Sequence, residues 1–268
     1  MQTIKNDEMK EWITISTNWF NNYCNLFTKL TESQQLNFAI KRDHSLRVAD
    51  IALLLADKLE WTDEEKQIAF LIGLLHDIGR FSQVVEFDTF SDDKSIDHAE
   101  NAVKILKEGN LFEVLNFENK ELVFAAILNH NKFKISDGLT GQELIHAKLI
   151  RDADKMDIFK VLTEYYLKRN GKLNHTLTWE LPKGTVVSPS VAKEVLAGKM
   201  VSKKNVASEI DVKIMQLSWV YDLNFRTTFE YLAKHRYLES VYNSLPKNDL
   251  VIEIYRKIKV YSENKIMS

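Results

Sequence analysis

The sequence is poor in residues that break helices and in residues that form cross-links. It contains eight glycines and three prolines in 268 residues, far below the usual combined frequency of about 12%. This scarcity argues against a turn-rich β-sandwich or barrel and against long disordered linkers. The single cysteine, Cys24, excludes an intramolecular disulfide, as is typical of a reducing compartment.

The chain also lacks an excess of charge of either sign and a long apolar run. Its 36 Lys and Arg residues face 38 Asp and Glu residues, which gives no electrostatic basis for binding duplex nucleic acid or an anionic membrane. No run approaches the ~18 apolar residues of a membrane helix, and the N-terminal sequence MQTIKNDEMKEW has no apolar core of a signal peptide. We therefore expect a cytoplasmic protein without a membrane partner.

Apolar residues recur mostly at helical spacing, and several segments carry their own start and stop signals. Thr62–Glu65 has the form of a capping box, in which a hydroxyl and a carboxylate lie three residues apart. Asp97 predicts the N-cap of a helix that ends near Gly109, and Ser188-Pro189 predicts another helix start. Further helices are expected near residues 12–30, 44–59, 119–131, 140–160, 208–222, 225–242 and 247–264.

One segment departs from helical spacing. Residues 175–187 alternate in the manner of a short hairpin, so we expect a small irregular or hairpin insertion there. No internal repeat, low-complexity tract or flexible linker requires a second domain. The fold class expected is therefore all-α, with residues 1–268 in a single domain.

Histidine and aspartate residues lie on several of these helices or at their ends. His76 and Asp77 end the most apolar helix, in the run LIGLLHDIGRF, where a carboxylate is costly unless it is paired, hydrogen-bonded or bound to a metal. A single histidine at a helix end is more often a capping or core residue, but the whole ordered set is hard to explain by chance. The candidate metal ligands are His44, His76, Asp77, His98, His130 and Asp154.

Helix geometry limits how the adjacent pair can act. Neighbouring side chains on a helix point about 100° apart. We therefore expect that His76 and Asp77 cannot act together as a pair of ligands to one ion. At a helix end they can serve neighbouring positions, with Asp77 bridging two ions. His146 shares a helical face with Asp154, which makes it a candidate to orient a ligand.

In this order, His44, the HDIGR run at 76–80 and the RDADKMD run at 151–157 resemble the HD superfamily of metal-dependent phosphohydrolases. The resemblance covers about residues 40–160 and implies a helical bundle, followed by a helical C-terminal extension over 165–268. It implies that four residues bind metal: His44, His76, Asp77 and Asp154.

The two remaining candidates, His98 and His130, match the extended pattern of the binuclear members of this superfamily. The resemblance therefore implies two divalent transition-metal ions. Imidazole with carboxylate favours Fe or Mn, with Zn, Ni or Mg as further options. A mononuclear site would be confined to the four ligands of the shorter pattern.

The chain departs from the family pattern at two places. The binuclear cyclic-di-GMP phosphodiesterases carry a double histidine and a Gly-Tyr-Pro signature, whereas this chain has Asn131 after His130 and no such signature. That substrate is therefore not assigned. Many members also have lysine where this chain has Arg80, which keeps the positive charge but changes its geometry.

The function that follows is hydrolysis of a small phosphoester, foremost a nucleotide, by metal-activated water. Asp77, Arg80 and Lys155 are the residues expected to take part in catalysis. By contrast, we interpret Arg47 and Arg151 as surface ion pairs.

Two alternatives stay open. The same six-ligand order resembles the HD-fold di-iron oxygenases, which cleave carbon–carbon or carbon–phosphorus bonds of small polyols or phosphonates. A non-catalytic, metal-stabilised helical module is the other alternative. A homodimer is compatible with the sequence, although no apolar stripe identifies an interface.

Overall fold

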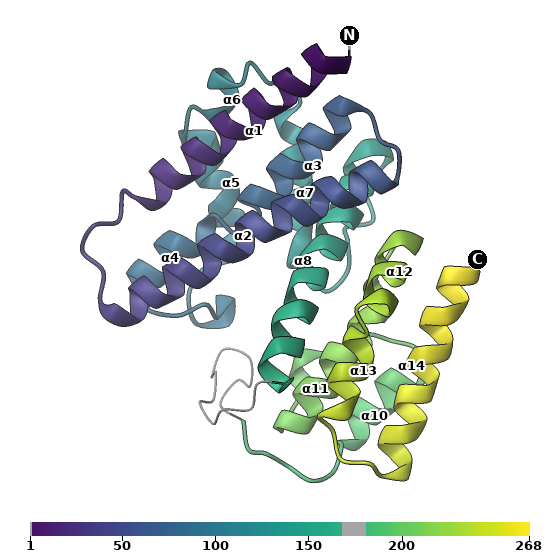
Figure 1. The fold of residues 1–268 in the computed structure, drawn as a ribbon. Helices are drawn as coiled ribbons and strands as arrows, with labels where there is room; N and C mark the ends of the chain where they lie inside the picture. Colours follow the sequence, from purple (N-terminus) through teal and green to yellow (C-terminus); the bar gives the residue numbers. More distant parts are fainter. Residues whose placement is uncertain (1, 168–180) are drawn as a thin grey trace. The chain divides into compact units, whose positions relative to one another are not determined.

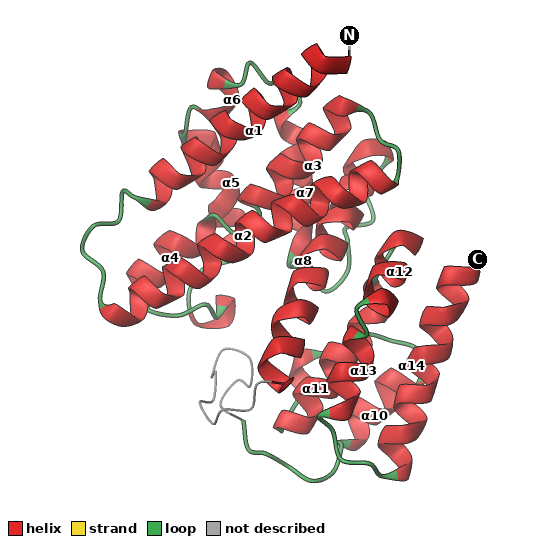
Figure 2. Ribbon diagram, in the orientation of Figure 1, coloured by secondary structure: helices red, strands yellow, loops and turns green. Residues whose placement is uncertain are grey.

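The structure is a computed structural model, which describes the backbone of residues 2–167 and 181–268. Within these residues the chain forms helices joined by loops and no strand (Figure 2), so the all-α expectation is confirmed. Part of the expected insertion at 175–187 lies outside the described residues. Its last residues, 181–187, have neither helix nor strand.

The chain divides into two compact units, residues 1–154 and 155–268. The boundary falls inside one long helix, which contributes its first half to one unit and its second half to the other. The assignment of residues 1–268 to a single domain stays a prediction.

The N-terminal unit is built from the helices drawn in purple to teal in Figure 1. They are α1 (Gln2–Cys24), α2 (Glu32–Lys58), α3 (Asp63–Leu75), α4 (Gly79–Phe87), η1 (Asp92–Lys94), α5 (His98–Glu108), α6 (Leu111–Val114), α7 (Lys120–His130) and the first half of α8 (Gly141–Leu167). Helix α3 packs against α1, α2 and α7, and α5 packs against α4 and α7. The central position of α3 brings its C-terminal end among the other helices of the unit.

The C-terminal unit contains shorter helices after the second half of α8. They are α10 (Pro189–Leu196), η2 (Lys203–Asn205), α11 (Glu209–Ser218), η3 (Trp219–Asp222), α12 (Arg226–Lys234), α13 (Tyr237–Asn243) and α14 (Asp249–Met267). Helix α14 packs against α10, α11 and α12, and its buried Ile254 and Ile258 lie four residues apart on one face.

Local capping explains where several helices begin and end. The Thr62 hydroxyl accepts from the Glu65 amide, and the Glu65 carboxylate accepts from the Thr62 amide, as the sequence predicts. Asp97 caps α5 by accepting from two backbone amides, and α5 ends at Gly109. These interactions satisfy backbone groups that a helix end otherwise leaves unpaired.

Several expected helices have different bounds. The segment 12–30 ends already at Cys24, and a capping box between Thr31 and Gln34 starts α2 twelve residues before the expected position of 44. The segment 225–242 is two helices because Arg236 adopts a left-handed backbone with φ 54°. Its guanidinium pairs with Glu239 one turn later.

Two close backbone approaches shape the N-terminal unit. A Cβ on Gly73 in α3 would lie 2.7 Å from the Cα of Ala49 in α2, and a Cβ on Gly79 would lie 2.1 Å from the carbonyl oxygen of His98. Both distances are far below van der Waals contact, so only glycine fits at either position. As a result α3 approaches α2 closely, and the start of α4 approaches the start of α5.

Among the described residues, one stretch, Asp63–Lys94, is long and apolar enough to cross a membrane by length and composition alone. It contains α3, α4 and η1. Of its most apolar window, 83% is buried inside the fold, as expected for the central helix of a packed core.

Candidate metal centre

The residues at the C-terminal end of α3 lie inside the N-terminal unit, not at its surface. The side chain of His76 is 1% exposed, and Asp77 is 3% exposed. His76 Nδ1 lies 2.7 Å from the carbonyl oxygen of Gly73, an atom that only accepts, so Nδ1 carries the proton. Its Nε2 therefore presents a lone pair, and this buried atom has no hydrogen-bond partner among the described residues.

His130, at the end of α7, is oriented in the same way. Its Nδ1 lies 2.6 Å from the carbonyl oxygen of Ile127, three residues earlier. His98, at the start of α5, directs Nδ1 to a carboxylate oxygen of Asp92 at 2.7 Å. Both rings therefore turn Nε2 inward, and the two Nε2 atoms lie 2.9 Å apart.

Asp77 lies between two pairs of histidines, and each of its oxygens faces one pair. Oδ2 lies 3.7 Å from His44 Nε2 and 3.6 Å from His76 Nε2. Oδ1 lies 3.3 Å from His98 Nε2 and 3.8 Å from His130 Nε2. One carboxylate is thus shared by two sets of donor atoms. The expectation that His76 and Asp77 cannot serve one ion together is wrong, because both follow the last residue of α3 in a turn and their donor atoms approach each other.

Asp154, on α8, adds a second carboxylate on the side of His44 and His76. Its Oδ1 lies 3.1 Å from His44 Nε2 and 3.9 Å from His76 Nε2. This buried oxygen has no partner in hydrogen-bond geometry among the described residues. The structure therefore brings all six predicted ligands together.

Burial and charge set the protonation states of this cluster. Burial lowers the pKa of His76 to about 3 and that of His98 to about 4, so both rings are neutral near pH 7. For Asp77 burial acts in the opposite direction, but the positive charges of Lys41 and Arg80 hold its pKa well below the usual range. Neutral imidazoles beside ionised carboxylates are the protonation states that a metal site requires.

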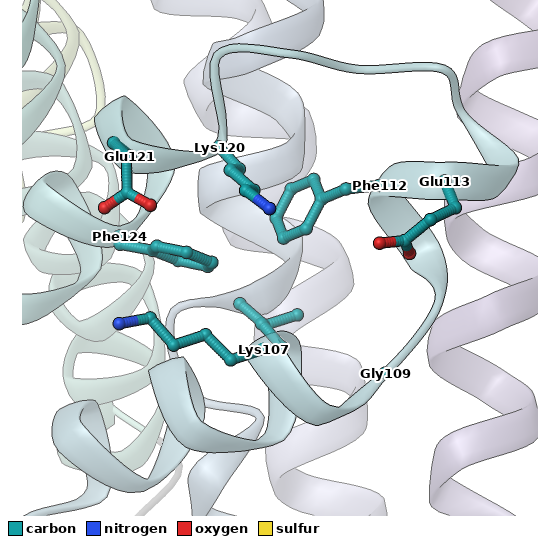
Figure 3. Close-up of a pocket in the computed structure, with 8 residues that line it drawn as sticks. Lys107, Gly109, Phe112, Glu113, Lys120, Glu121 and Phe124 are labelled. Atoms are coloured by element: carbon teal, nitrogen blue, oxygen red, sulfur yellow. The ribbon is translucent and has the colours of Figure 1, made fainter.

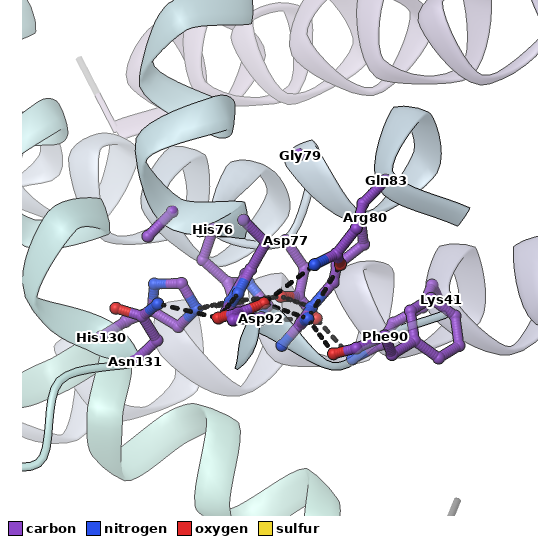
Figure 4. A network of polar contacts seen from close by, with 12 residues as sticks. Lys41, His76, Asp77, Gly79, Arg80, Gln83, Phe90, Asp92, His130 and Asn131 are labelled. Carbon is purple, nitrogen blue, oxygen red and sulfur yellow. Dashed lines mark hydrogen bonds and ion pairs between the residues drawn. The ribbon is translucent and has the colours of Figure 1, made fainter. Parts of the chain in front are cut away.

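Two cations reach the shared carboxylate (Figure 4). Lys41, one turn before His44 on α2, places Nζ 2.6 Å from Asp77 Oδ2. Arg80 places Nε 3.4 Å from Asp77 Oδ1. Both cations lie over the ring of Phe90, at 5.6 and 6.0 Å from its centroid.

Two residues at the site, Lys41 and Asp92, are not among those that the sequence predicts. Lys41 carries a local signal, because residues three apart on a helix share a face and Lys41 precedes His44 by three. Asp92 carries none, because it lies in the non-periodic segment between α4 and α5. Its ion pair with Arg80, at 2.8 Å, depends on the tertiary fold.

Other predicted residues have different surroundings. Lys155 pairs with Asp222 at 2.7 Å, and its part in catalysis stays a prediction. His146 bonds to the carbonyl oxygen of Gln142 at 2.9 Å and packs against Trp61, so its described partners are not ligand candidates.

The interpretation of Arg151 as a surface ion pair is wrong. Arg151 is 2% exposed, and its guanidinium donates to the carbonyl oxygens of Asn129, His130 and Lys132. The first two carbonyls belong to the end of α7, where a helix leaves its last acceptors unpaired, and Lys132 follows directly after that end. Arg151 therefore caps α7 directly at the ligand candidate His130.

A small cavity of about 160 Å³ lies at the ends of α5 and α7 (Figure 3). Phe112 and Phe124 line it together with Lys107, Lys120 and other residues. It shares no lining residue with the histidine–aspartate cluster.

The donor set fits a divalent transition metal. Among the described residues three groups of three donor atoms could hold a metal ion, with all atoms of a group within 4.8 Å of one another. Two of them share Asp77 and consist of His44, His76 and Asp77, and of Asp77, His98 and His130, whereas the third consists of Asp92, Asp97 and His98. Imidazole and carboxylate are ligands of Fe, Mn, Zn and Ni. The inward lone pairs, above all the unpartnered Nε2 of His76, are oriented for a cation.

Comparison with known proteins agrees with this geometry. Residues 42–158 match the family model described as the HD domain, a span that includes all six ligand candidates. No curated protein and no solved structure matches the chain at a significant level.

Proposed function

Residues 42–158 form an HD domain, and we propose that the chain uses it as a metal-dependent phosphohydrolase. The substrate proposed is a small phosphoester, foremost a nucleotide. The HD family consists mostly of metal-dependent phosphohydrolases. The proposed site of this activity is the cluster of ligand candidates around Asp77.

One observation carries the proposal. The two oxygens of Asp77 face different histidine pairs, one made by His44 and His76 and the other by His98 and His130. This arrangement supports two ions with Asp77 as the shared ligand, and Asp154 as a further ligand of the first. Iron or manganese is proposed, because mixed imidazole and carboxylate donors suit both.

Bound divalent ions supply Lewis acidity, which makes water nucleophilic near neutral pH. The chain's own residues hold these ions through neutral imidazoles and ionised carboxylates. Arg80 and Lys41 add positive charge beside Asp77, where a phosphate group would gain charge-assisted hydrogen bonds. Phe90 lies beside both cations, so an aromatic ring flanks the proposed phosphate contact.

The remaining parts of the proposal concern partners and location. The partner proposed is a phosphorylated small molecule, and Lys155 is proposed as an additional cation in catalysis. Duplex nucleic acid and membranes are not proposed as partners, because the formal net charge is only -2. A cytoplasmic location and a homodimer complete the proposal.

A phosphate-release assay tests the proposed activity. Metal-stripped protein is reloaded with Mn²⁺ or Fe²⁺ under nitrogen and offered a panel of nucleoside mono-, di- and triphosphates. The expected result is phosphate or nucleotide release that needs metal and no oxygen. Asp77→Asn should be inactive, and the exposed Asp93→Asn is the matched control.

Two outcomes would overturn the proposal. Oxygen uptake coupled to turnover of a polyol or a phosphonate, without phosphoester hydrolysis, would assign an oxygenase. Stoichiometric metal binding without turnover of any phosphoester in the panel would assign a non-catalytic metal-stabilised module.

A further inference from the structure

In the segment between α4 and α5, the carboxylate of Asp92 contacts the histidine–aspartate cluster. Asp92 Oδ2 accepts from His98 Nδ1 at 2.7 Å, with Asn131 Nδ2 at 3.4 Å. Asp92 Oδ1 accepts from Arg80 Nη1 at 2.8 Å and from Gln83 Nε2 at 2.9 Å. The side chain of Asp92 is 30% exposed, so it lies at the edge of the cluster.

The Oδ2 contact determines which nitrogen of His98 faces the cluster. A carboxylate accepts and does not donate, so the proton of the neutral His98 ring stays on Nδ1. Nε2 then keeps its lone pair and points to His130 and Asp77. A carboxylate behind an imidazole ligand fixes the tautomer and the ring orientation, and raises the basicity of the nitrogen that binds metal.

The Oδ1 contact restrains Arg80. The same Nη1 of Arg80 also donates to Gln83 Oε1 at 2.9 Å and to the carbonyl oxygen of Phe90. Gln83 is fully buried and donates to the Ser95 hydroxyl and the Ile96 carbonyl as well. This buried amide holds the segment, so Asp92 is a fixed anchor for the guanidinium (Figure 4).

We propose that Asp92 is a positioning residue that holds two parts of the centre at once. Through Oδ2 it presents His98 as a ligand of the second ion. Through Oδ1 it orients Arg80 toward the phosphate of the substrate, a half of the proposal that rests on the proposed function. Loss of Asp92 therefore weakens one metal position and the phosphate contact, and leaves His44, His76 and Asp154 in place.

Neighbouring residues provide matched controls. Asp93 lies next to Asp92 in the same short η1 turn and is exposed. Asp93→Asn removes one negative charge from the same turn. Among the described contacts of His98, none is made by Asp93. Asp92→Asn keeps the size of the side chain and one acceptor oxygen, so it folds even where Asp92→Ala is too disruptive.

The first experiment measures metal binding and the His98 tautomer without turnover. Metal-free protein is titrated with Mn²⁺, and unbound Mn²⁺ is counted by electron paramagnetic resonance. We expect Asp92→Ala to weaken the second ion about 10- to 100-fold and to leave the first unchanged. Histidine ¹⁵N resonances of the metal-free protein should show His98 change from one tautomer to a mixture, whereas Asp93→Asn leaves both readouts unchanged.

The second experiment measures inorganic phosphate binding to the Mn²⁺-loaded protein by calorimetry. Asp92→Asn should bind phosphate about tenfold more weakly, because Arg80 loses its anchor. Unchanged phosphate affinity would overturn the arginine half of the proposal.

The outcomes separate this inference from the proposed function. Unchanged Mn²⁺ affinity and an unchanged His98 tautomer in both Asp92 variants would overturn the histidine half. Equal weakening of both ions with a lower melting temperature would also overturn it, because that pattern marks a structural role. If the unmodified chain hydrolyses no phosphoester, the proposed function fails, while the metal and tautomer readouts still decide the role of Asp92.

Discussion

The Nε2 atoms of His98 and His130 lie 2.9 Å apart. Each ring directs its Nδ1 to an acceptor, one to Asp92 and the other to the carbonyl oxygen of Ile127. Two imidazole nitrogens this close together are placed to bind one cation through their lone pairs. The pair therefore favours a bound metal ion by its geometry.

The shared carboxylate gives the first prediction. Asp77→Ala removes an oxygen from both donor sets, so the chain should fall from two bound ions to fewer than one. Activity should fall at least 1000-fold, since both ions depend on the same side chain. Elemental analysis and the phosphate-release assay measure the two effects, and a variant with full activity would contradict the bridging role.

The two histidine pairs give a second prediction. His98→Ala should leave one ion per chain, because His44, His76 and Asp154 still surround the first position. His44→Ala should also leave one ion per chain, bound at the position that Asp77, His98 and His130 surround. Metal counting by mass spectrometry of the folded protein checks both variants, and an unchanged count of two in either one would show that its histidine is structural.

The contact at Gly79 gives a third prediction. Gly79→Ala would place a Cβ 2.1 Å from the His98 carbonyl oxygen. Such overpacking should lower the free energy of unfolding by about 3 kcal/mol. Gly138 has open space around it, so Gly138→Ala should change stability by less than about 0.5 kcal/mol. Urea denaturation compares the two, and equal effects would refute the close approach.

The buried guanidinium gives a fourth prediction. Arg151→Met leaves several carbonyl oxygens at the end of α7 without a donor, at a cost of about 1–3 kcal/mol for each unsatisfied group. We expect a loss of about 3 kcal/mol in the free energy of unfolding. Arg226 is exposed and pairs with Glu230 one turn later in its own helix, so Arg226→Met is the control. A similar small effect in both would show that the cap does not stabilise the fold.

The lowered histidine pKa values give a fifth prediction, for metal-free protein. The unfolded chain takes up protons below the ordinary histidine pKa of about 6.5, whereas folded His76 and His98 stay neutral down to about 3 and 4. The unfolded state therefore gains protons first, and stability falls as pH decreases. Between pH 7 and 5 the loss should be on the order of 2 kcal/mol per histidine.

Chemical denaturation at several pH values checks this dependence. His76→Gln removes one of the two groups and should make the decline shallower. A flat profile between pH 7 and 5 in the unmodified chain would contradict the neutral, buried histidines.

The features of the fold that the sequence predicts well are local. The capping residue Asp97 bonds to amides two and three residues away, so its signal lies within one turn. Thr31 and Gln34 carry the same kind of local signal, a capping box, and it places the start of α2 at Glu32 rather than at the expected residue 44. The break at Arg236 has no comparable signal, because neither glycine nor proline marks the left-handed residue.

The candidate site was predictable to a different extent. His76 and Asp77 stand out because an apolar helix ends at a charged pair, and the order of the other ligands gives the family resemblance. Asp92 could not be found this way, because its partner Arg80 lies twelve residues earlier and across a turn. The burial of Arg151 was not predictable in this way, because the carbonyl oxygens that accept from its guanidinium leave no side-chain signal in the sequence.

The fit between Gly79 and the backbone of His98 also bears on how such a centre can evolve. The contact fixes the start of α4 against the start of α5, whatever the length of the chain that connects the two helices. Insertions or deletions near residues 88–91 would therefore change the loop without moving His98, since loop length costs little free energy. Descendants of this chain could acquire new substrates through that loop while inheriting the same ligands.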